Sequence, residues 1–322
     1  MAAAALLALA AWLVGLGALL EQLRRVDPFW FALAVMAMAA SQWVSAARWV
    51  SIATILGLKA PAPDLRLAYA QAMAVNVVLP GATLGGDTLR SVRLQRLGNP
   101  LGESALSVLI DRASGLWILC LLSLFTGLGL LLGGHLDRLR LPNGAGGLDT
   151  RTVVWLYLGA LSVAVALPFV PLRLPGNGAS ARGGTRRVLA RLAELHGLTV
   201  SRGRALARSL WSSLLVQLLC ALALWLCQAA AGGRAGYLAV QAIAAPVFIA
   251  GVVPLSYGGF GARELVSLLV FPLIGVDAQT AVTAGALYGL AGVLLGLATA
   301  PLLLLRASPV PLGRSAGGEG PT

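Results

Sequence analysis

Charged residues are scarce in this sequence. Of its 322 residues only 11% are Asp, Glu, Lys or Arg, whereas 58% are hydrophobic. Soluble domains carry roughly 25% charged residues, so a soluble chain of this composition would have too few polar side chains to cover its surface. Several apolar runs also reach the roughly 20 residues that cross a bilayer. The composition therefore excludes an ordinary soluble protein and predicts an integral membrane protein.

Lysine, histidine and cysteine are also rare. Lys59 is the sole lysine, and the two histidines, His135 and His196, lie in loops between apolar runs. The three cysteines lie inside apolar runs, without the spacing of a disulfide framework or a metal site. Two glycine clusters lie within apolar segments, at residues 81–86 and 258–261. Neither has the sequence of a nucleotide-binding loop. We therefore expect no cofactor, no metal and no catalytic residues, and we do not expect an enzyme.

The positive charge comes almost entirely from arginines between apolar runs, which together give a formal net charge of +12. This pattern is typical of cytoplasmic loops of membrane proteins, and no basic patch with interleaved aromatic residues indicates a nucleic acid partner. The densest basic stretch, residues 173–208, is predicted to be cytoplasmic, as a surface helix or as a solvated linker. Counting spans from it places both termini in the cytoplasm and the chain in the cell (cytoplasmic) membrane.

The apolar runs predict an all-α fold, a polytopic membrane helix bundle. Residues 1–308 form a single transmembrane domain, and the Gly/Pro/Ser-rich tail at 309–322 is predicted to be disordered. Six full spans are expected at residues 2–20, 29–56, 102–133, 152–172, 209–231 and 279–305.

Two more apolar segments, 67–97 and 237–275, are interrupted by proline and glycine. Each contains an apolar run, a proline, several glycines, and then an acidic residue with an arginine within three residues. They lie at comparable places in the two halves of the chain, which indicates a pseudo-repeat. The predicted break residues are Pro80, Gly81, Gly85, Gly86, Pro254, Gly258, Gly259 and Gly261.

These interruptions predict two re-entrant hairpins. Proline and glycine disfavour helix, and broken backbone at membrane depth must be buried in protein or must line a wet cavity. Paired interruptions of this kind indicate a central binding site in transporters. Two alternatives stay open: the glycine clusters are external loops between ordinary helices, or the arms of each hairpin are separate, short spans.

Ionisable residues within or beside the apolar runs are the candidate ligands of a lipid headgroup. A charge at the bilayer centre costs about 2.5–3.5 kcal/mol on insertion scales, so it should face the bundle interior with a partner. Arginine can hold a phosphate through two parallel hydrogen bonds. The candidates are Arg48, Asp87, Arg90, Asp111, Arg112, Arg263 and Glu264.

Each candidate also has a simpler interpretation. Arg48 could reach the cytoplasmic interface, and Arg90 could be only a cytoplasmic topology anchor. The adjacent pairs Asp111–Arg112 and Arg263–Glu264 could be structural ion pairs between helices.

Several of these residues together resemble one family. They are Arg48-Trp49, Pro80-Gly81 followed by Gly85-Gly86-Asp87 and Arg90, Asp111-Arg112 with Gly115-Leu116, and the stretch from Pro254 through Gly258-Gly259-Phe260-Gly261-Ala262-Arg263-Glu264. The chain resembles, over nearly its whole length, the flippase-like family, the transmembrane domain of lysylphosphatidylglycerol synthetases. The resemblance implies a lipid-translocating domain with re-entrant helices.

In two-domain members of that family a soluble aminoacyl-transferase follows the membrane part. The tail after residue 308 is too short for such a domain, so lysyl transfer is not expected of this chain. We expect a transporter or flippase for a phospholipid or a polyprenyl-phosphate-linked lipid. Alternatives are a scaffold for a partner synthetase or glycosyltransferase and a membrane enzyme acting on lipid phosphate. A second copy of this chain, in a homo-oligomer, is a further candidate partner.

Overall fold

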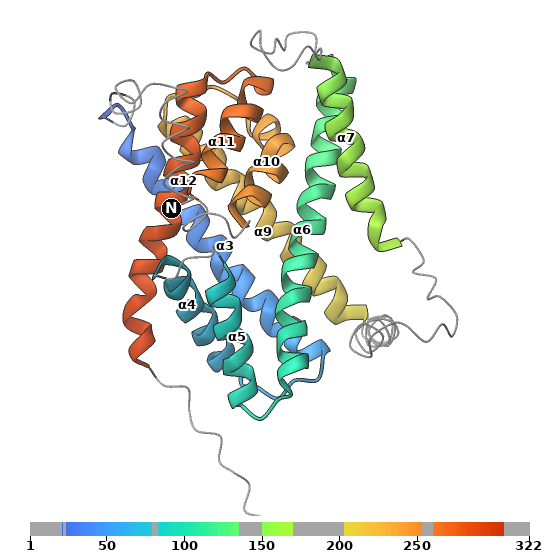
Figure 1. Ribbon diagram of the computed structural model, residues 1–322, viewed down its shortest axis with the longest axis vertical. Coiled ribbons are helices and arrows are strands. Elements are labelled where there is room, and N and C mark those ends of the chain that lie inside the picture. The colour runs from blue at the N-terminus through green and yellow to red at the C-terminus, as the bar shows by residue number, and fades with distance from the viewer. Residues whose placement is uncertain are drawn as a thin grey trace, which may run out of the picture.

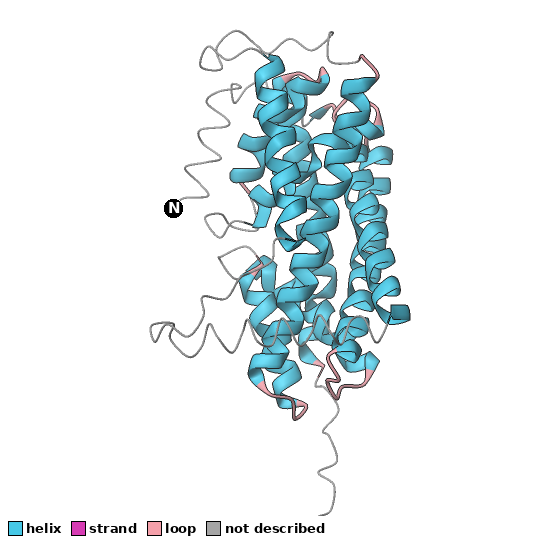
Figure 2. Cartoon of the chain, turned by 90° about the vertical axis from the view of Figure 1, so that its right-hand side faces the viewer, coloured by secondary structure: helices cyan, strands magenta, loops and turns pink. Residues whose placement is uncertain are grey.

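The computed structural model describes residue 21 and residues 24–78, 83–134, 150–169, 203–252 and 260–305. All regular elements among these residues are helices (Figure 2), which confirms the predicted fold class at this level. Parts of the prediction lie outside the described residues: the span at 2–20, the basic stretch up to residue 202, the tail, and five of the break residues. These five are Pro80, Gly81, Pro254, Gly258 and Gly259.

Within the described residues, four helices are long and apolar enough to cross a membrane. They are α3 (Pro28–Ile55), α6 (Leu101–Leu132), α9 (Gly203–Ala230) and α12 (Ala278–Thr299), the last continued by the 3-10 helix η4 (Ala300–Leu304). The bounds of α3 and α6 agree with the predicted spans to within one residue, because hydropathy changes sharply at their ends. A shorter apolar helix, α7 (Thr150–Ala166), continues into η2 (Leu167–Phe169) and packs against α6.

The two interrupted segments each form a pair of shorter helices. The first pair is α4 (Ala62–Val78) with α5 (Leu84–Arg96), and the second is α10 (Tyr237–Val252) with α11 (Ala262–Val270), which the 3-10 helix η3 (Phe271–Ile274) extends. In Figure 1 the first pair lies in the lower half of the bundle and the second pair in the upper half.

Local sequence explains where these helices begin. Asp27 caps α3 by accepting a hydrogen bond of 2.8 Å from the backbone N–H of Phe29. The first interrupted segment, predicted to begin at residue 67, begins five residues earlier, because α4 starts at Ala62. Pro63 does not prevent this, since the first turn of a helix has no intrahelical partner for its N–H groups.

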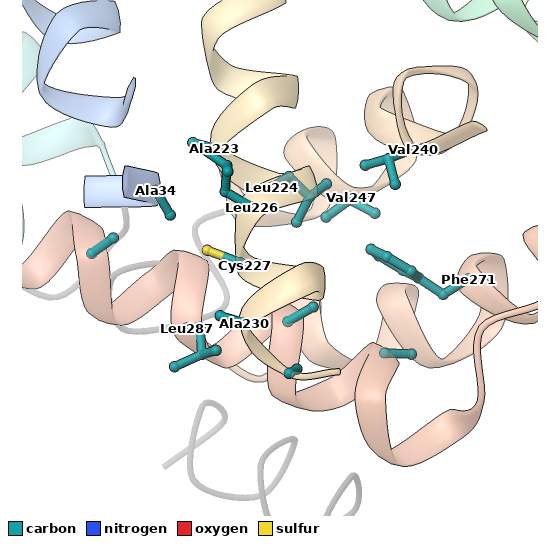
Figure 3. Close-up of a cluster of buried hydrophobic side chains, with 14 of the residues drawn as sticks. Ala34, Ala223, Leu224, Leu226, Cys227, Ala230, Val240, Val247, Phe271 and Leu287 are labelled. Atoms are coloured by element: carbon teal, nitrogen blue, oxygen red, sulfur yellow. The ribbon is translucent and has the colours of Figure 1, made fainter. Parts of the chain in front are cut away.

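The upper half of the bundle is held together by small and aliphatic side chains. Figure 3 shows Ala34 of α3 near Ala223 and Cys227 of α9, with Val247 of α10 and Phe271 of η3 completing the cluster. Small residues let membrane helices approach closely, which favours van der Waals packing where lipid provides little hydrophobic drive. This packing fixes α3 and α9, the helices that run from this core toward the charged residues below.

Helix α12 contacts both broken segments through glycines. A Cβ atom at Gly285 would lie 2.9 Å from the Ser267 hydroxyl of α11, and one at Gly296 would lie 2.2 Å from a Val77 methyl of α4. Side chains cannot be accommodated at such distances, so the backbone of α12 lies directly against its neighbours. The same helix therefore touches the lower and the upper pair.

A buried asparagine joins the ends of α3, α5 and α6. The Asn99 amide oxygen accepts from the Lys59 N–H at 2.8 Å, and its amide nitrogen donates to the carbonyls of Lys59 and Leu94, both at 2.9 Å. These bonds connect the turn after α3 to the turn between α5 and α6. They hold the three helices that supply the charged residues in one arrangement.

We predict that Asn99→Ala lowers the free energy of unfolding by about 2–4 kcal/mol, because the mutation breaks three hydrogen bonds and leaves buried backbone groups unpaired. Unfolding of the purified protein in mixed detergent micelles measures the change. Gln95→Ala, an exposed position in the preceding helix, serves as the control. Equal stability of both variants would contradict the role given to Asn99.

Candidate functional site

Five of the seven predicted charged residues come together in the lower half of the bundle. Three helices supply them: α3, α5 and α6. We call this group the five-charge cluster, and its members are Arg48, Asp87, Arg90, Asp111 and Arg112.

Asp111 is the buried centre of the five-charge cluster. Its side chain is only 1% exposed, and its two oxygens accept from Arg48 Nε and from Arg90 Nη2, both at 2.8 Å. Arg48 and Arg90 are therefore both held inside the bundle by this carboxylate. One carboxylate from α6 joins arginines of α3 and α5, as expected for charges that must be paired inside a bundle.

Asp87 and Arg112 form the outer part of the cluster. Arg112 donates through Nε and Nη2 to the Asp87 carboxylate, with distances of 3.0 Å to Oδ2 and 2.8 Å to Oδ1. This is the two-pronged geometry that arginine also uses for phosphate. The Arg112 side chain is 37% exposed and that of Asp87 is 20% exposed, so this pair can be reached from outside the protein.

Arg90 bridges the inner and outer parts of the cluster. Besides Asp111 it contacts Asp87, with Nη1 3.5 Å from Oδ1. Its guanidinium carbon lies 4.2 Å from the ring centre of Trp49 and 4.7 Å from that of Tyr69. The aromatic faces stabilise the buried cation, and the Trp49 indole N–H is itself bonded to the Ser107 hydroxyl at 3.2 Å. Arg90 is thereby fixed in place.

Sequence reasoning did not identify these aromatic partners as part of the site. Tyr69 gave no signal, because it lies within an apolar segment and its ring contact joins residues 21 positions apart. Trp49 gave a weak signal, since it follows Arg48 directly in the motif that carried the family resemblance.

Helix α9 supports the cluster from its other side. The Ser213 hydroxyl lies 3.3 Å from Arg48 Nη1, and the Gln217 amide donates to the Gly115 carbonyl at 3.0 Å. A Cβ atom at Gly115 would lie 3.0 Å from Arg48 Nη1. Glycine at this position leaves room for the arginine between α6 and α9, which explains why Gly115 accompanies Asp111 one turn earlier.

The charges of the cluster do not cancel. Three arginines and two aspartates give a formal charge of +1. An excess charge in a bundle interior is stabilised by an anion, and the exposed guanidinium of Arg112 can hydrogen-bond to one. Among the described residues no group of His, Cys, Asp and Glu could hold a metal ion. The arrangement is thus suited to binding a phosphate or another oxyanion.

Arg263 and Glu264, the other two predicted residues, are not part of this cluster. They lie on α11, which packs against α10 and α12 in the upper half of the bundle (Figure 1). The Arg263 guanidinium carbon is 5.3 Å from the ring centre of Tyr288, and the group fits beside Gly251 and Gly289, where any Cβ atom would crowd it. The single headgroup site expected from all seven residues is therefore divided between two halves of the molecule.

The break residues within the described part of the chain have distinct local roles. Gly85 and Gly86 belong to the first turn of α5 rather than to the break itself. Gly86 lets α5 approach α4, because its N–H donates to Asn76 Oδ1 at 2.8 Å and a Cβ atom there would lie 2.5 Å from the same oxygen. Gly261 caps α11 with a φ of 93°, a left-handed conformation that favours glycine.

Comparison with known proteins agrees with the predicted family. The model of the family described as "Lysylphosphatidylglycerol synthase TM region" matches residues 1–300 of this chain. A search of curated proteins gave no match.

Proposed function

Because the chain belongs to the family of lysylphosphatidylglycerol synthase transmembrane regions, it is a membrane domain related to lipid handling, and we propose that it is a lipid transporter. The proposed activity is that of a flippase, which moves a phospholipid or a polyprenyl-phosphate-linked lipid from one leaflet to the other. The proposed site of headgroup binding is the five-charge cluster, with Arg112 as the first residue that the headgroup contacts.

The surplus positive charge of the five-charge cluster is the observation that carries this proposal. Asp111 neutralises one of the two arginines bonded to it, and Asp87 holds Arg112 at the accessible edge. Moving an ionised headgroup unaided through hydrocarbon costs many kcal/mol. A fixed guanidinium that replaces water around the phosphate removes part of this cost, and the net charge of one selects an anionic lipid.

Binding proceeds by exchange of partners in this proposal. The phosphate takes the two donor groups of Arg112 that Asp87 now accepts, at 3.0 and 2.8 Å. Arg90 lies 3.5 Å from the Asp87 carboxylate and can keep it compensated when Arg112 leaves. The buried pairs of Asp111 stay closed during this exchange, so the bundle does not lose its inner contacts.

The two pairs of short helices provide the proposed route across the membrane. We propose that α4–α5 and α10–α11 are re-entrant hairpins that enter from opposite faces and line a hydrophilic path where they end. Their positions in opposite halves of the bundle support this arrangement (Figure 1). In the proposed orientation the chain lies in the cell membrane, with both termini and the α4–α5 side in the cytoplasm.

Reconstitution tests the proposal directly. Purified protein in liposomes should move fluorescent phosphatidylglycerol between leaflets faster than protein-free liposomes do, as measured by quenching of the outer leaflet with dithionite. Phosphatidylcholine with the same label should move more slowly, because it lacks net negative charge. Inhibition by unlabelled polyprenyl phosphate would identify the second class of substrate.

Rates equal to those of protein-free liposomes for every lipid would contradict the transporter. If the purified protein instead changed the lipid chemically, the membrane-enzyme alternative would hold. Co-purification of a synthetase or glycosyltransferase with an inactive protein would favour the scaffold.

A further inference from the structure

Among the residues that the structure describes, one buried carboxyl group lies outside the five-charge cluster and has no role so far. Glu264, in the first turn of α11, is 0% exposed. One of its oxygens, Oε2, accepts a hydrogen bond from the backbone N–H of Gly261, and this bond closes the cap of the helix. The other, Oε1, is buried and has no hydrogen-bond partner. The carboxyl group is thus half satisfied.

A second polar group lies on the same side of the helix, one turn further on. The Ser267 hydroxyl is also buried and has no hydrogen-bond partner. Both residues face α12 at Gly285, where a Cβ atom would lie 2.9 Å from Ser267 Oγ and 3.5 Å from Glu264 Cα. Since glycine contributes no side chain, α12 offers these two groups neither a donor nor an opposite charge at that point.

The elements packed around Glu264 contain few groups that could stabilise a negative charge. Helix α11 packs against α10, α12 and η3. In the sequences of these elements the ionisable side chains are Tyr237 of α10 and Tyr288 of α12. Arg263, next to Glu264 on α11, is the one cation in the sequences of these elements, and its positive charge favours an ionised Glu264, but its guanidinium lies at the ring of Tyr288. None of the ion pairs in the described part of the chain includes Glu264.

An ionised carboxylate in this position would carry a charge in a low-dielectric interior with one oxygen unsolvated, which is strongly unfavourable. Adding a proton to Oε1 removes the charge and converts an acceptor without a donor into a hydroxyl donor. Exchange of this proton with water would require α11 and α12 to separate at their contact.

We propose that Glu264 is a proton-binding site, occupied in this conformation and emptied when the contact between α11 and Gly285 of α12 opens to water. Its role in transport rests on the function proposed above: release of this proton on one side of the membrane would couple lipid movement to a proton gradient. Proton binding itself does not depend on that function, and it can be measured without any lipid substrate.

Infrared spectroscopy of the protein in lipid nanodiscs at neutral pH tests the proton site. The wild type should show the C=O stretch of a protonated carboxyl group in a dry environment, which Glu264→Gln should lack. Glu103→Gln, which alters a carboxyl group in the first turn of α6, is the matched control and should keep the band. Absence of the band in the wild type, or its persistence in Glu264→Gln, would overturn the proposal.

One further variant distinguishes loss of the proton site from misfolding, and a transport assay distinguishes it from failure of the transporter. Gly285→Ala, which pushes α12 away from Ser267, should weaken the band although Glu264 is retained, and an unchanged band contradicts the assigned site.

In liposomes without membrane potential, a gradient of one pH unit should let the wild type accumulate lipid about tenfold in one leaflet. Glu264→Gln should move lipid without accumulation. If lipid moves but no band is seen, only the proton site fails; if the band is seen but no lipid moves, only the transporter fails.

Discussion

Arg112→Ala should slow lipid movement by about ten- to hundredfold and leave the fold intact. A hydrogen bond to a charged group contributes about 1.5–3 kcal/mol, and each 1.4 kcal/mol is about a tenfold change. The residue lies at the exposed edge of the cluster, where its removal leaves no buried cavity. Dithionite quenching of labelled phosphatidylglycerol in liposomes measures the rate.

Two further variants make this prediction specific. Arg96→Ala removes an arginine from the exposed end of α5 and should keep the wild-type rate, so a general effect of positive charge would be detected. Arg112→Lys keeps the charge but loses the two parallel hydrogen bonds, and its rate should fall between those of wild type and Arg112→Ala. Wild-type rates in both Arg112 variants would exclude this residue from headgroup binding.

Asp111→Asn should lower the free energy of unfolding by about 3–5 kcal/mol, the usual effect of removing one partner of a buried ion pair. The mutation leaves two buried arginines, Arg48 and Arg90, without the carboxylate that each contacts at 2.8 Å. Unfolding in mixed micelles, monitored by circular dichroism, measures the loss. Asp64→Asn, in the first turn of α4, should change stability by less than about 0.5 kcal/mol.

A compensating substitution distinguishes charge from shape in this case. Arg48→Met added to Asp111→Asn returns the formal charge of the cluster to +1 and should recover part of the stability, since one uncompensated buried charge is removed. If the double variant is less stable than Asp111→Asn alone, packing of Arg48 against α6 and α9 matters more than its charge.

Hydropathy was sufficient to predict the helices of the membrane core. The ends of α3 and α6, and those of α12 taken together with η4, lie within one residue of the predicted positions, because a span begins and ends where apolar sequence does. Of the residues predicted to break the first segment, Gly85 and Gly86 are instead helical in α5, whereas Pro80 and Gly81 lie outside the described residues. Glycine permits a turn without requiring one, so composition alone could not separate a break from a close helix contact.

The sequence identified the charged residues of the candidate site but not their partners. A buried charge must be paired, which singles out Arg48 and Asp111, yet nothing in the sequence indicates that residues 63 positions apart share a bond. For the same reason all seven charges were assigned to one site, whereas α11 contributes its two to the other half of the bundle. Pairing depends on helix packing, which periodicity does not determine. The re-entrant course of the hairpins and the headgroup role of these residues stay predictions.

The glycine contacts of α12 have a mechanical consequence. At Gly285 and Gly296 the side chains of Ser267 of α11 and Val77 of α4 sit directly over the glycine, so α12 is held in register with both neighbours, and a shift of either pair would displace α12 with it. A rigid rod that touches both halves transmits any such displacement from one end to the other. An event at Glu264 would then reach the α4–α5 pair, and through α5 the Asp87–Arg112 contact, without an intermediate chain of polar residues.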